Sequence, residues 1–294
     1  MGSIKTSKLR AALERHAAIS ESKLGKRHPH AASWFAKRGI RPGDIRLHAA
    51  RLASAGALAG AMLMGTPFIS KGASFGTDKI ANAPLDSIQN LFSDNLKSLL
   101  PSSVHPLNPE IEDQISRIIE EFWGIRASAK LDGEHLNTTY GYMGAEQHLP
   151  HFPGDSVSQH DAYQQSGITP GKGAWGYFAN SKNELTDDLV QKEKYYVAVQ
   201  TLYLPDWETR LPYLREWYKY RKVMVINPTN GKTVVAVVAD AGPANWTGKS
   251  FGASPEIMAY LDMKDGAQRG PAILFFVDDK DNAIPLGPVE RRNK

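Results

Sequence analysis

The sequence of 294 residues contains no cysteine, which excludes disulfide bonds and cysteine-ligated metal sites. Basic charge is scarce outside the beginning of the chain. Residues 1–51 hold 12 of the 35 Lys and Arg residues and three acidic residues, so the remainder carries 23 basic and 28 acidic residues. A nucleic-acid-binding surface needs an excess of positive charge on the folded part. We therefore expect no nucleic-acid partner.

Long hydrophobic runs are also missing. The apolar run at residues 52–64 has 13 residues, fewer than the roughly 20 that a full membrane span requires. Hydrophobic residues make up 41% of the chain and charged residues 22%, as in ordinary globular proteins. The length suits one or two domains with a packed core.

Residues 47–67 predict a signal-anchor or a signal peptide. An apolar run with arginines before it is typical of both, and these arginines are Arg38, Arg41, Arg46 and Arg51. The positive-inside rule places residues 1–46 in the cytoplasm as a basic tail and the rest of the chain outside. We expect a single-pass protein of the cell membrane with its C-terminal domain outside, or a protein secreted after cleavage. The alternative for so short a run is a buried helix of a soluble domain.

The next segments are a linker and a helix. Residues 68–107, rich in small and polar residues, predict a linker with one short helix near residues 85–100. Residues 108–130 form a helical lead-in, because Asn108 is a capping residue, Pro109 suits the first turn and Gly124 ends the pattern. Apolar residues recur between them at helical spacing: Ile111, Ile115, Ile118, Ile119 and Phe122.

Residues 131–294 change to short strands and frequent turns. Strands are expected at residues 194–203, 222–226, 233–239 and 272–277, with a further segment at 283–289 closing the sheet. Asn230-Gly231 predicts a hairpin between the second and third of these strands. Ser254 and the proline after it predict a short helix. Short strands with one inserted helix predict a mainly β fold, a barrel and not a doubly wound sheet.

Residues 194–290 resemble the double-psi β-barrel family that includes rare lipoprotein A, expansins and membrane-bound lytic transglycosylase A. The resemblance rests on the turn at residues 227–231, the strand end Val237-Val238-Ala239-Asp240-Ala241-Gly242-Pro243 and the following Gly-Lys before a helix. Residues 196–200 occupy the place of the family's preceding strand. The resemblance implies a six-stranded double-psi barrel outside the membrane that engages cell-wall glycan.

The sequence departs from the family pattern at two functional positions. The family has a second Asp after the Gly-Lys, where this chain has Gly252-Ala253-Ser254. The family's His in the preceding strand aligns with Gln200. Residues 204–221 form an insertion that carries several aromatic residues. Aromatic and basic residues alternate at residues 217–222, which predicts a half-exposed strand in preference to a nucleic-acid stacking surface. Chemistry that depends on the second Asp or on the His is absent here or relocated.

Asp240 is the leading catalytic candidate. By resemblance it matches the general acid of the lytic transglycosylases, which need a single carboxyl group. The alternative is structural, since an Asp before Gly-Pro often bonds the backbone of its own turn. Glu146, in the polar loop at residues 144–155, is the candidate second carboxylate facing Asp240.

Substrate binding is expected from aromatic and polar residues near these carboxylates. Flat aromatic side chains pack against the apolar face of a sugar, which points to Trp246 and Trp175. The alternative for each is a core position, and the polar neighbours of Trp246 favour the sugar role for that residue only. Asn245 and Lys249 lie in the same loop as Trp246, and His148 lies in the loop of Glu146.

The sequence therefore predicts an extracytoplasmic protein that acts on peptidoglycan or another cell-wall glycan, with lytic transglycosylase activity and no metal or other cofactor. Two alternatives stay open. One is a non-catalytic, expansin-like glycan-binding module. The other is a zinc hydrolase in which His148 and His151, with His160-Asp161 downstream, supply the three ligands that a catalytic zinc ion requires.

Overall fold

The computed structural model describes residues 84–263 and 269–290, which all belong to a unit spanning residues 75–294. The predicted basic tail and the signal-anchor at residues 47–67 lie outside the described residues. Within the described ranges, no helix combines the length and the apolar character that a membrane crossing needs.

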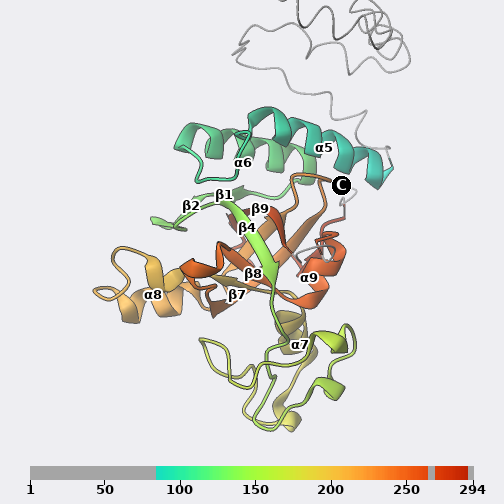
Figure 1. Ribbon diagram of the computed structural model, residues 1–294, viewed down its shortest axis with the longest axis vertical. Helices are drawn as coiled ribbons and strands as arrows, with labels where there is room; N and C mark the ends of the chain where they lie inside the picture. Colours follow the sequence, from blue (N-terminus) through green and yellow to red (C-terminus); the bar gives the residue numbers. More distant parts are fainter. Residues whose placement is uncertain (1–83, 264–268, 291–294) are drawn as a thin grey trace, which may run out of the picture. The chain divides into compact units, whose positions relative to one another are not determined.

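Six strands form a closed barrel in the described part of the chain (Figure 1). Around the ring they run β4 (Tyr140–Ala145), β8 (Phe251–Ala253), β5 (Tyr196–Val199), β7 (Thr233–Ala241), β6 (Lys222–Ile226) and β9 (Arg269–Val277), which returns to β4. The pairs β4–β8 and β5–β7 are parallel, and the other neighbours are antiparallel. This mixed, closed barrel is compatible with a double-psi fold and confirms the mainly β class.

The hairpin predicted from Asn230-Gly231 joins β6 and β7. The register runs from Lys222 opposite Val237 to Ile226 opposite Thr233. The Asn227 amide closes the turn by donating to the Lys232 carbonyl over 2.9 Å. The expected strand at residues 194–203 is shorter than predicted, because Thr201–Tyr203 turns into a 3-10 helix, η4.

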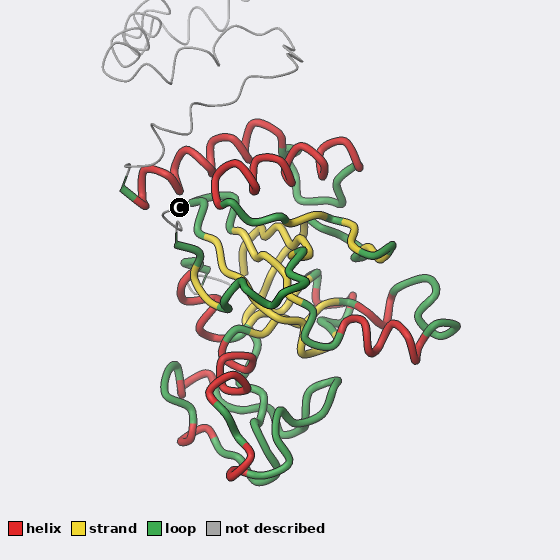
Figure 2. The backbone as a smooth tube through the Cα atoms, turned by 180° about the vertical axis from the view of Figure 1, so that it is seen from behind, coloured by secondary structure: helices red, strands yellow, loops and turns green. Residues whose placement is uncertain are grey.

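Both faces of β6 are buried, which explains its uninterrupted apolar sequence. Val223 and Val225 belong to the core inside the barrel, whereas Met224 and Ile226 pack outward. Two helices, α5 (Leu85–Leu99) and α6 (Pro109–Trp123), cover this outer face. In Figures 1 and 2 the two helices lie side by side across one side of the barrel.

The lead-in helix begins and ends where the sequence predicts. The Asn108 side chain accepts a hydrogen bond from the Ile111 amide over 2.9 Å, and Gly124 ends α6 in the left-handed conformation at a φ of 65°. The short helix predicted near residues 85–100 is confirmed as α5, but it is not part of a free linker. It packs on α6 through Phe92, which is fully buried and whose ring centroid lies 5.3 Å from that of Phe122.

The insertion at residues 204–221 is helical over α8 (Leu211–Tyr218), and not the half-exposed strand that its alternating aromatic and basic residues predict at residues 217–222. Trp217 and Tyr218 are buried against the barrel core. Their burial explains the aromatic residues without a stacking surface.

A loop-rich lobe, residues 146–195, lies on the side of the barrel opposite α5 and α6 (Figures 1 and 2). Its regular elements are η1 (Val157–Gln159), η2 (Gln164–Ser166), η3 (Lys182–Glu184) and α7 (Asp187–Lys194). The remaining elements flank the barrel: β1 (Ala127–Ser128), β2 (Lys130–Leu131), β3 (Glu134–His135), η5 (Asn245–Thr247), α9 (Pro255–Tyr260) and β10 (Gly287–Pro288).

Candidate functional site

A β-bulge near the end of β7 decides where Asp240 points. Val197 pairs with Val238 and Ala198 pairs with Asp240, so Ala239 is an extra residue on β7. Strict alternation from Val238, which lies in the barrel core, would turn Asp240 inward. The bulge shifts this parity by one residue and places Asp240 on the outer face beside Ala198.

Small residues continue from Asp240 across the neighbouring strands. Ala198 of β5 pairs with Gly252 of β8, and Gly252 pairs with Gly144 of β4. Paired residues in a sheet share a face. Asp240 therefore heads a row of residues with little or no side chain on the outer wall of the barrel.

Two charged side chains lie over the glycines of this row. A methyl group added at Gly252 would lie 2.3 Å from Oε1 of Glu146, and one added at Gly144 would lie 2.3 Å from Cε of Lys249. The two glycines thus make room for Glu146 and Lys249. We call Asp240, Glu146 and Lys249, with Gly144 and Gly252 beneath them, the carboxylate site.

Asp240 is half-buried and anchored through one oxygen. Its Oδ1 accepts hydrogen bonds from the Ala174 amide over 2.8 Å and from the Ala241 amide over 2.9 Å. Burial raises the pKa of Asp240 above the ordinary value, although these two amides oppose the shift. Oδ2 accepts no hydrogen bond from the residues that the structure describes, so it is the oxygen available to carry a proton toward a ligand.

Glu146 shares the electrostatics of Asp240. Burial raises the pKa of Glu146, Lys249 opposes the shift, and the charge of Asp240 adds to it. The structure therefore brings Glu146 under the electrostatic influence of Asp240. It also brings Lys249 to Glu146, although the sequence predicted Lys249 only as a substrate-binding residue.

The loop after β7 holds Trp246 and Asn245. Trp246 is 88% exposed and is not part of the core. Gln200 fixes this loop, because its Nε2 donates to the Asn245 side chain over 2.8 Å and to the Pro243 carbonyl over 2.9 Å. Gln200, which aligns with the His of the resembling family, thus fixes the position of this loop by hydrogen bonds.

Trp175 and Ser254 have packing roles. Trp175 is half-buried against the barrel core and donates from Nε1 to the Arg215 carbonyl over 2.7 Å, so it ties the turn of Ala174 to α8. Ser254 is fully buried and caps α9 by accepting from the Ile257 amide. The second Asp of the resemblance aligns with Gly252, which has no side chain to replace it.

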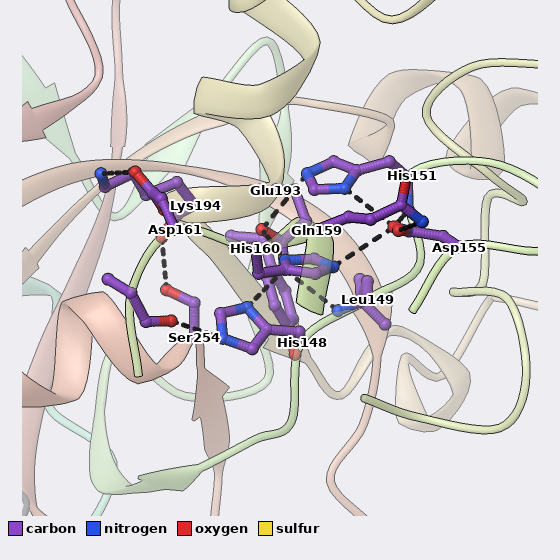
Figure 3. Close-up of polar contacts among 12 residues, drawn as sticks. His148, Leu149, His151, Asp155, Gln159, His160, Asp161, Glu193, Lys194 and Ser254 are labelled. Atoms are coloured by element: carbon purple, nitrogen blue, oxygen red, sulfur yellow. Dashed lines mark hydrogen bonds and ion pairs between the residues drawn. The ribbon is translucent and has the colours of Figure 1, made fainter. Parts of the chain in front are cut away.

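His148 does not join the carboxylate site. The sequence predicted it as a substrate-binding residue, but its side chain is 0% exposed inside the lobe. It belongs to a second group of polar side chains, the histidine cluster, which consists of His148, His151, Asp155, His160 and Glu193 (Figure 3).

The donor atoms of the histidine cluster lie within 4.8 Å of one another in two overlapping sets that both suit a metal ion: His148, His160 and Glu193 in one, and His151, Asp155 and His160 in the other. The cluster draws on three parts of the lobe: the segment just after β4, the loop around η1, and α7. The rings of His148 and His151 each lie 4.3 Å, between centroids, from that of His160.

Burial and hydrogen bonding act against each other in the histidine cluster. Burial lowers the pKa of His151. Burial alone would raise the pKa of Glu193, but hydrogen bonds from His148 and His160 hold it at about 2. The carboxylate of Glu193 is therefore ionised inside the lobe.

Sequence reasoning missed Glu193, the amide of Ala174 and the bulge at Ala239. Glu193 sits in a charged helix, where its neighbours Lys192 and Lys194 make it look like a surface residue. The spacing of His148, His151 and His160 was visible in the sequence, and the structure does bring them together.

The chain matches no known protein-family model, and it matches no curated protein. The interpretation of its function therefore rests on the fold, the carboxylate site and the resemblance at residues 194–290.

Proposed function

We propose that this protein acts on cell-wall glycan outside the cytoplasmic membrane, as a lytic transglycosylase in which Asp240 is the general acid. The observation that carries the proposal is the bulge at Ala239, which turns Asp240 out of the barrel interior and onto the face of Glu146 and Lys249. A structural Asp in a Gly-Pro turn would not require this arrangement.

The reaction needs one carboxyl group in two successive roles. Asp240 first donates its proton to the glycosidic oxygen, and the bond from that oxygen to the sugar C1 breaks. The resulting carboxylate then accepts the proton of the sugar's own 6-hydroxyl while the 6-oxygen bonds to C1. The products are an anhydro-sugar end and a free hydroxyl end, and no water is consumed.

The environment of Asp240 suits these roles. Burial favours the protonated form, and the Ala174 and Ala241 amides hold Oδ1 in place while stabilising the carboxylate that forms after proton transfer. Trp246, exposed in the loop that follows Asp240, offers a flat apolar surface for a sugar ring.

A non-catalytic glycan-binding module is the second candidate. Gly252 and Gln200, which align with the family's second Asp and its His, are a glycine beneath Glu146 and a residue that fixes the loop after β7. If catalysis in this fold requires those two groups, the same exposed aromatic residue and polar loop still bind glycan.

Trp246→Ala is expected to weaken binding to insoluble peptidoglycan about tenfold, which corresponds to about 1.4 kcal/mol, because an exposed aromatic platform contributes mainly to binding. A pull-down with purified peptidoglycan measures the affinity. Tyr213→Ala, which removes another exposed aromatic side chain from α8, is the matched control. Equal binding by wild type and Trp246→Ala would remove Trp246 from the site.

The proposal also requires that the barrel lie outside the cytoplasmic membrane. Full-length protein is expected to sediment with membranes or to appear in the medium after cleavage, and protease added to intact cells should digest residues 131–294. Fractionation followed by detection of the C-terminus tests this. Recovery of the whole chain in the cytosol, protected from protease, would contradict the cell-wall assignment.

A further inference from the structure

In the histidine cluster, both nitrogens of each histidine ring face an oxygen atom of a neighbouring residue. His148 Nδ1 lies 3.1 Å from Oε1 of Glu193, and its Nε2 lies 3.1 Å from the Ala162 carbonyl. His160 Nδ1 lies 3.4 Å from Oε2 of Glu193, and its Nε2 lies 3.2 Å from Oδ2 of Asp155. Both rings therefore bridge Glu193 to a second acceptor.

His151 repeats the arrangement with one difference. Its Nδ1 lies 2.8 Å from Oδ2 of Asp155, but its Nε2 lies 3.7 Å from Oε2 of Glu193 and has no hydrogen-bond partner among the described residues. The His151 side chain is only 3% exposed, so this nitrogen is a buried polar atom aimed at Glu193. Such an atom requires an explanation.

Hydrogen bonds alone cannot satisfy this arrangement at low cost. A neutral imidazole has one N–H and one lone pair, so a ring between two acceptors must be doubly protonated or must point a lone pair at an oxygen. Three imidazolium rings would bring three positive charges against the two carboxylates of Asp155 and Glu193 in a buried site. Unpaired charge and unsatisfied polar atoms are both expensive to bury.

A divalent metal ion removes the conflict. Each neutral ring then directs its lone pair to the metal and its N–H to the second acceptor, which is Asp155 or the Ala162 carbonyl. Two positive charges on the metal balance the two carboxylates. Histidine ligands in proteins characteristically donate their other N–H to a carboxylate or a carbonyl in this way.

We propose that His148, His151, His160 and Glu193 bind one Zn²⁺ ion that holds the lobe together. Ligands bonded at about 2.0–2.1 Å in tetrahedral geometry lie about 3.3 Å apart. His160 Nδ1 and His151 Nε2 lie 3.4 and 3.7 Å from Oε2 of Glu193, and His148 Nδ1 lies 3.1 Å from its Oε1, which are spacings close to this value. Four donors without cysteine make a closed set for zinc.

Glu193, and not Asp155, is the carboxylate ligand. Asp155 already accepts hydrogen bonds from protein donors, the amides of His151 and Ser156 and the side chain of Gln159, over 2.7 to 3.0 Å. These bonds fix Asp155 as the acceptor that orients His151 and His160. Glu193 accepts one backbone hydrogen bond, from the Leu149 amide to Oε1 over 3.1 Å, and it directs Oε2 at two ring nitrogens, His151 Nε2 and His160 Nδ1.

Burial makes this a structural site. The four ligand side chains are 0% to 3% exposed, so none of them faces a solvent-accessible position where a zinc-bound water could meet a substrate. This favours a structural ion over the zinc hydrolase alternative.

The lobe has only a small apolar core that could stabilise its fold. In its apolar cluster only Leu149 and Phe178 are buried residues of the lobe, and they pack with Tyr196 of β5 and Ala239 of β7; the chain has no cysteine for disulfides. A metal ion joins the segment after β4, the loop around η1 and α7 in place of a larger core.

Metal analysis of the full-length protein tests the proposal. Protein expressed with added zinc and purified without a histidine tag is expected to contain about one zinc ion per chain. Glu193→Gln and His160→Gln should lose the ion, whereas Asp155→Asn should bind zinc about 10- to 100-fold more weakly. Glu184→Gln, an exposed acid in the same lobe, and His105→Gln are the matched controls and should keep the ion.

Wild-type protein alone provides a test that does not depend on the folding of variants. A chelator should lower its Tm, and added Zn²⁺ should restore the Tm by at least about 5 °C. Co²⁺ in place of zinc should give the visible absorption of a tetrahedral site. Zinc-supplemented protein that contains no metal, and whose Tm responds to neither Zn²⁺ nor chelator, would overturn the proposal. Retention of one zinc ion by Glu193→Gln would overturn the ligand assignment.

Discussion

Asp240→Asn is expected to reduce the release of soluble fragments from purified peptidoglycan at least about 100-fold, because removal of a general acid costs about that much or more. The amide keeps the shape of the side chain and can still accept from the Ala174 amide through its oxygen. It cannot donate a proton to a glycosidic oxygen and then take one back. The loss should therefore fall on turnover and not on binding.

Controls separate chemistry from folding in this experiment. Asp240→Asn should sediment with peptidoglycan as wild type does, and its Tm should stay close to the wild-type value. Asp86→Asn, an exposed acid in the first turn of α5, is the matched control and should retain full activity. Wild-type activity in Asp240→Asn would remove Asp240 from the mechanism and leave it the structural role of a turn residue.

The pH dependence of the same activity has a defined sign. Burial raises the pKa of Asp240, so the protonated, active form persists to higher pH than for an ordinary Asp. The rate is expected to fall as pH rises through this pKa. The amides of Ala174 and Ala241 donate to Asp240 and oppose the shift, and the charge of Asp240 acts on Glu146. A rate that rises with pH throughout the acid range would contradict the assignment of Asp240 as the acid.

Gly231→Ala is expected to lower the free energy of unfolding by about 3 kcal/mol, because two costs coincide at this residue. Gly231 has a φ of 76°, which an alanine adopts only with strain, and an added methyl group would lie 2.0 Å from the Gln89 carbonyl oxygen of α5. The helix must move away from the hairpin. The Ser93 hydroxyl, which lies 2.8 Å from the Pro228 carbonyl oxygen and 2.9 Å from that of Thr229, would lose both acceptors.

Gly124→Ala is the matched control for this effect. Gly124 has a similar φ of 65°, but an added methyl group would meet nothing within 4 Å. Gly124→Ala should therefore lower the free energy of unfolding by about 1 kcal/mol, through backbone strain alone. Urea denaturation of both variants measures the difference. Equal losses in the two variants would show that contact between the hairpin and α5 contributes nothing to stability.

Much of the barrel follows from local sequence signals. Asn230-Gly231 fixes the β6–β7 hairpin, and Asn108 and Gly124 fix the ends of α6, because turns and caps depend on a few adjacent residues. The alternating aromatic and basic residues at positions 217–222 were misleading. The helix α8 buries Trp217 and Tyr218 against the barrel, and that contact with distant residues is not encoded in the local pattern.

The candidate sites were only partly predictable for the same reason. Asp240 and Glu146 were identified from a motif and a polar loop, but the bulge that brings them to one face depends on the pairing of β5 with β7. Glu193 reads as a surface residue of a charged helix, and it becomes a buried ligand candidate only when the lobe folds around it. Convergence of residues 45 positions apart, such as His148 and Glu193, is a property of the tertiary structure.

The most direct test of the account is mass spectrometry of the soluble products that wild-type protein releases from purified peptidoglycan. A lytic transglycosylase acting through Asp240 produces fragments that end in a 1,6-anhydro sugar, because the 6-hydroxyl replaces water as the nucleophile. We expect these ends from wild type and none from Asp240→Asn. Fragments with ordinary reducing ends would indicate hydrolysis and contradict the mechanism, and the absence of any fragment would contradict the enzyme and leave a glycan-binding module.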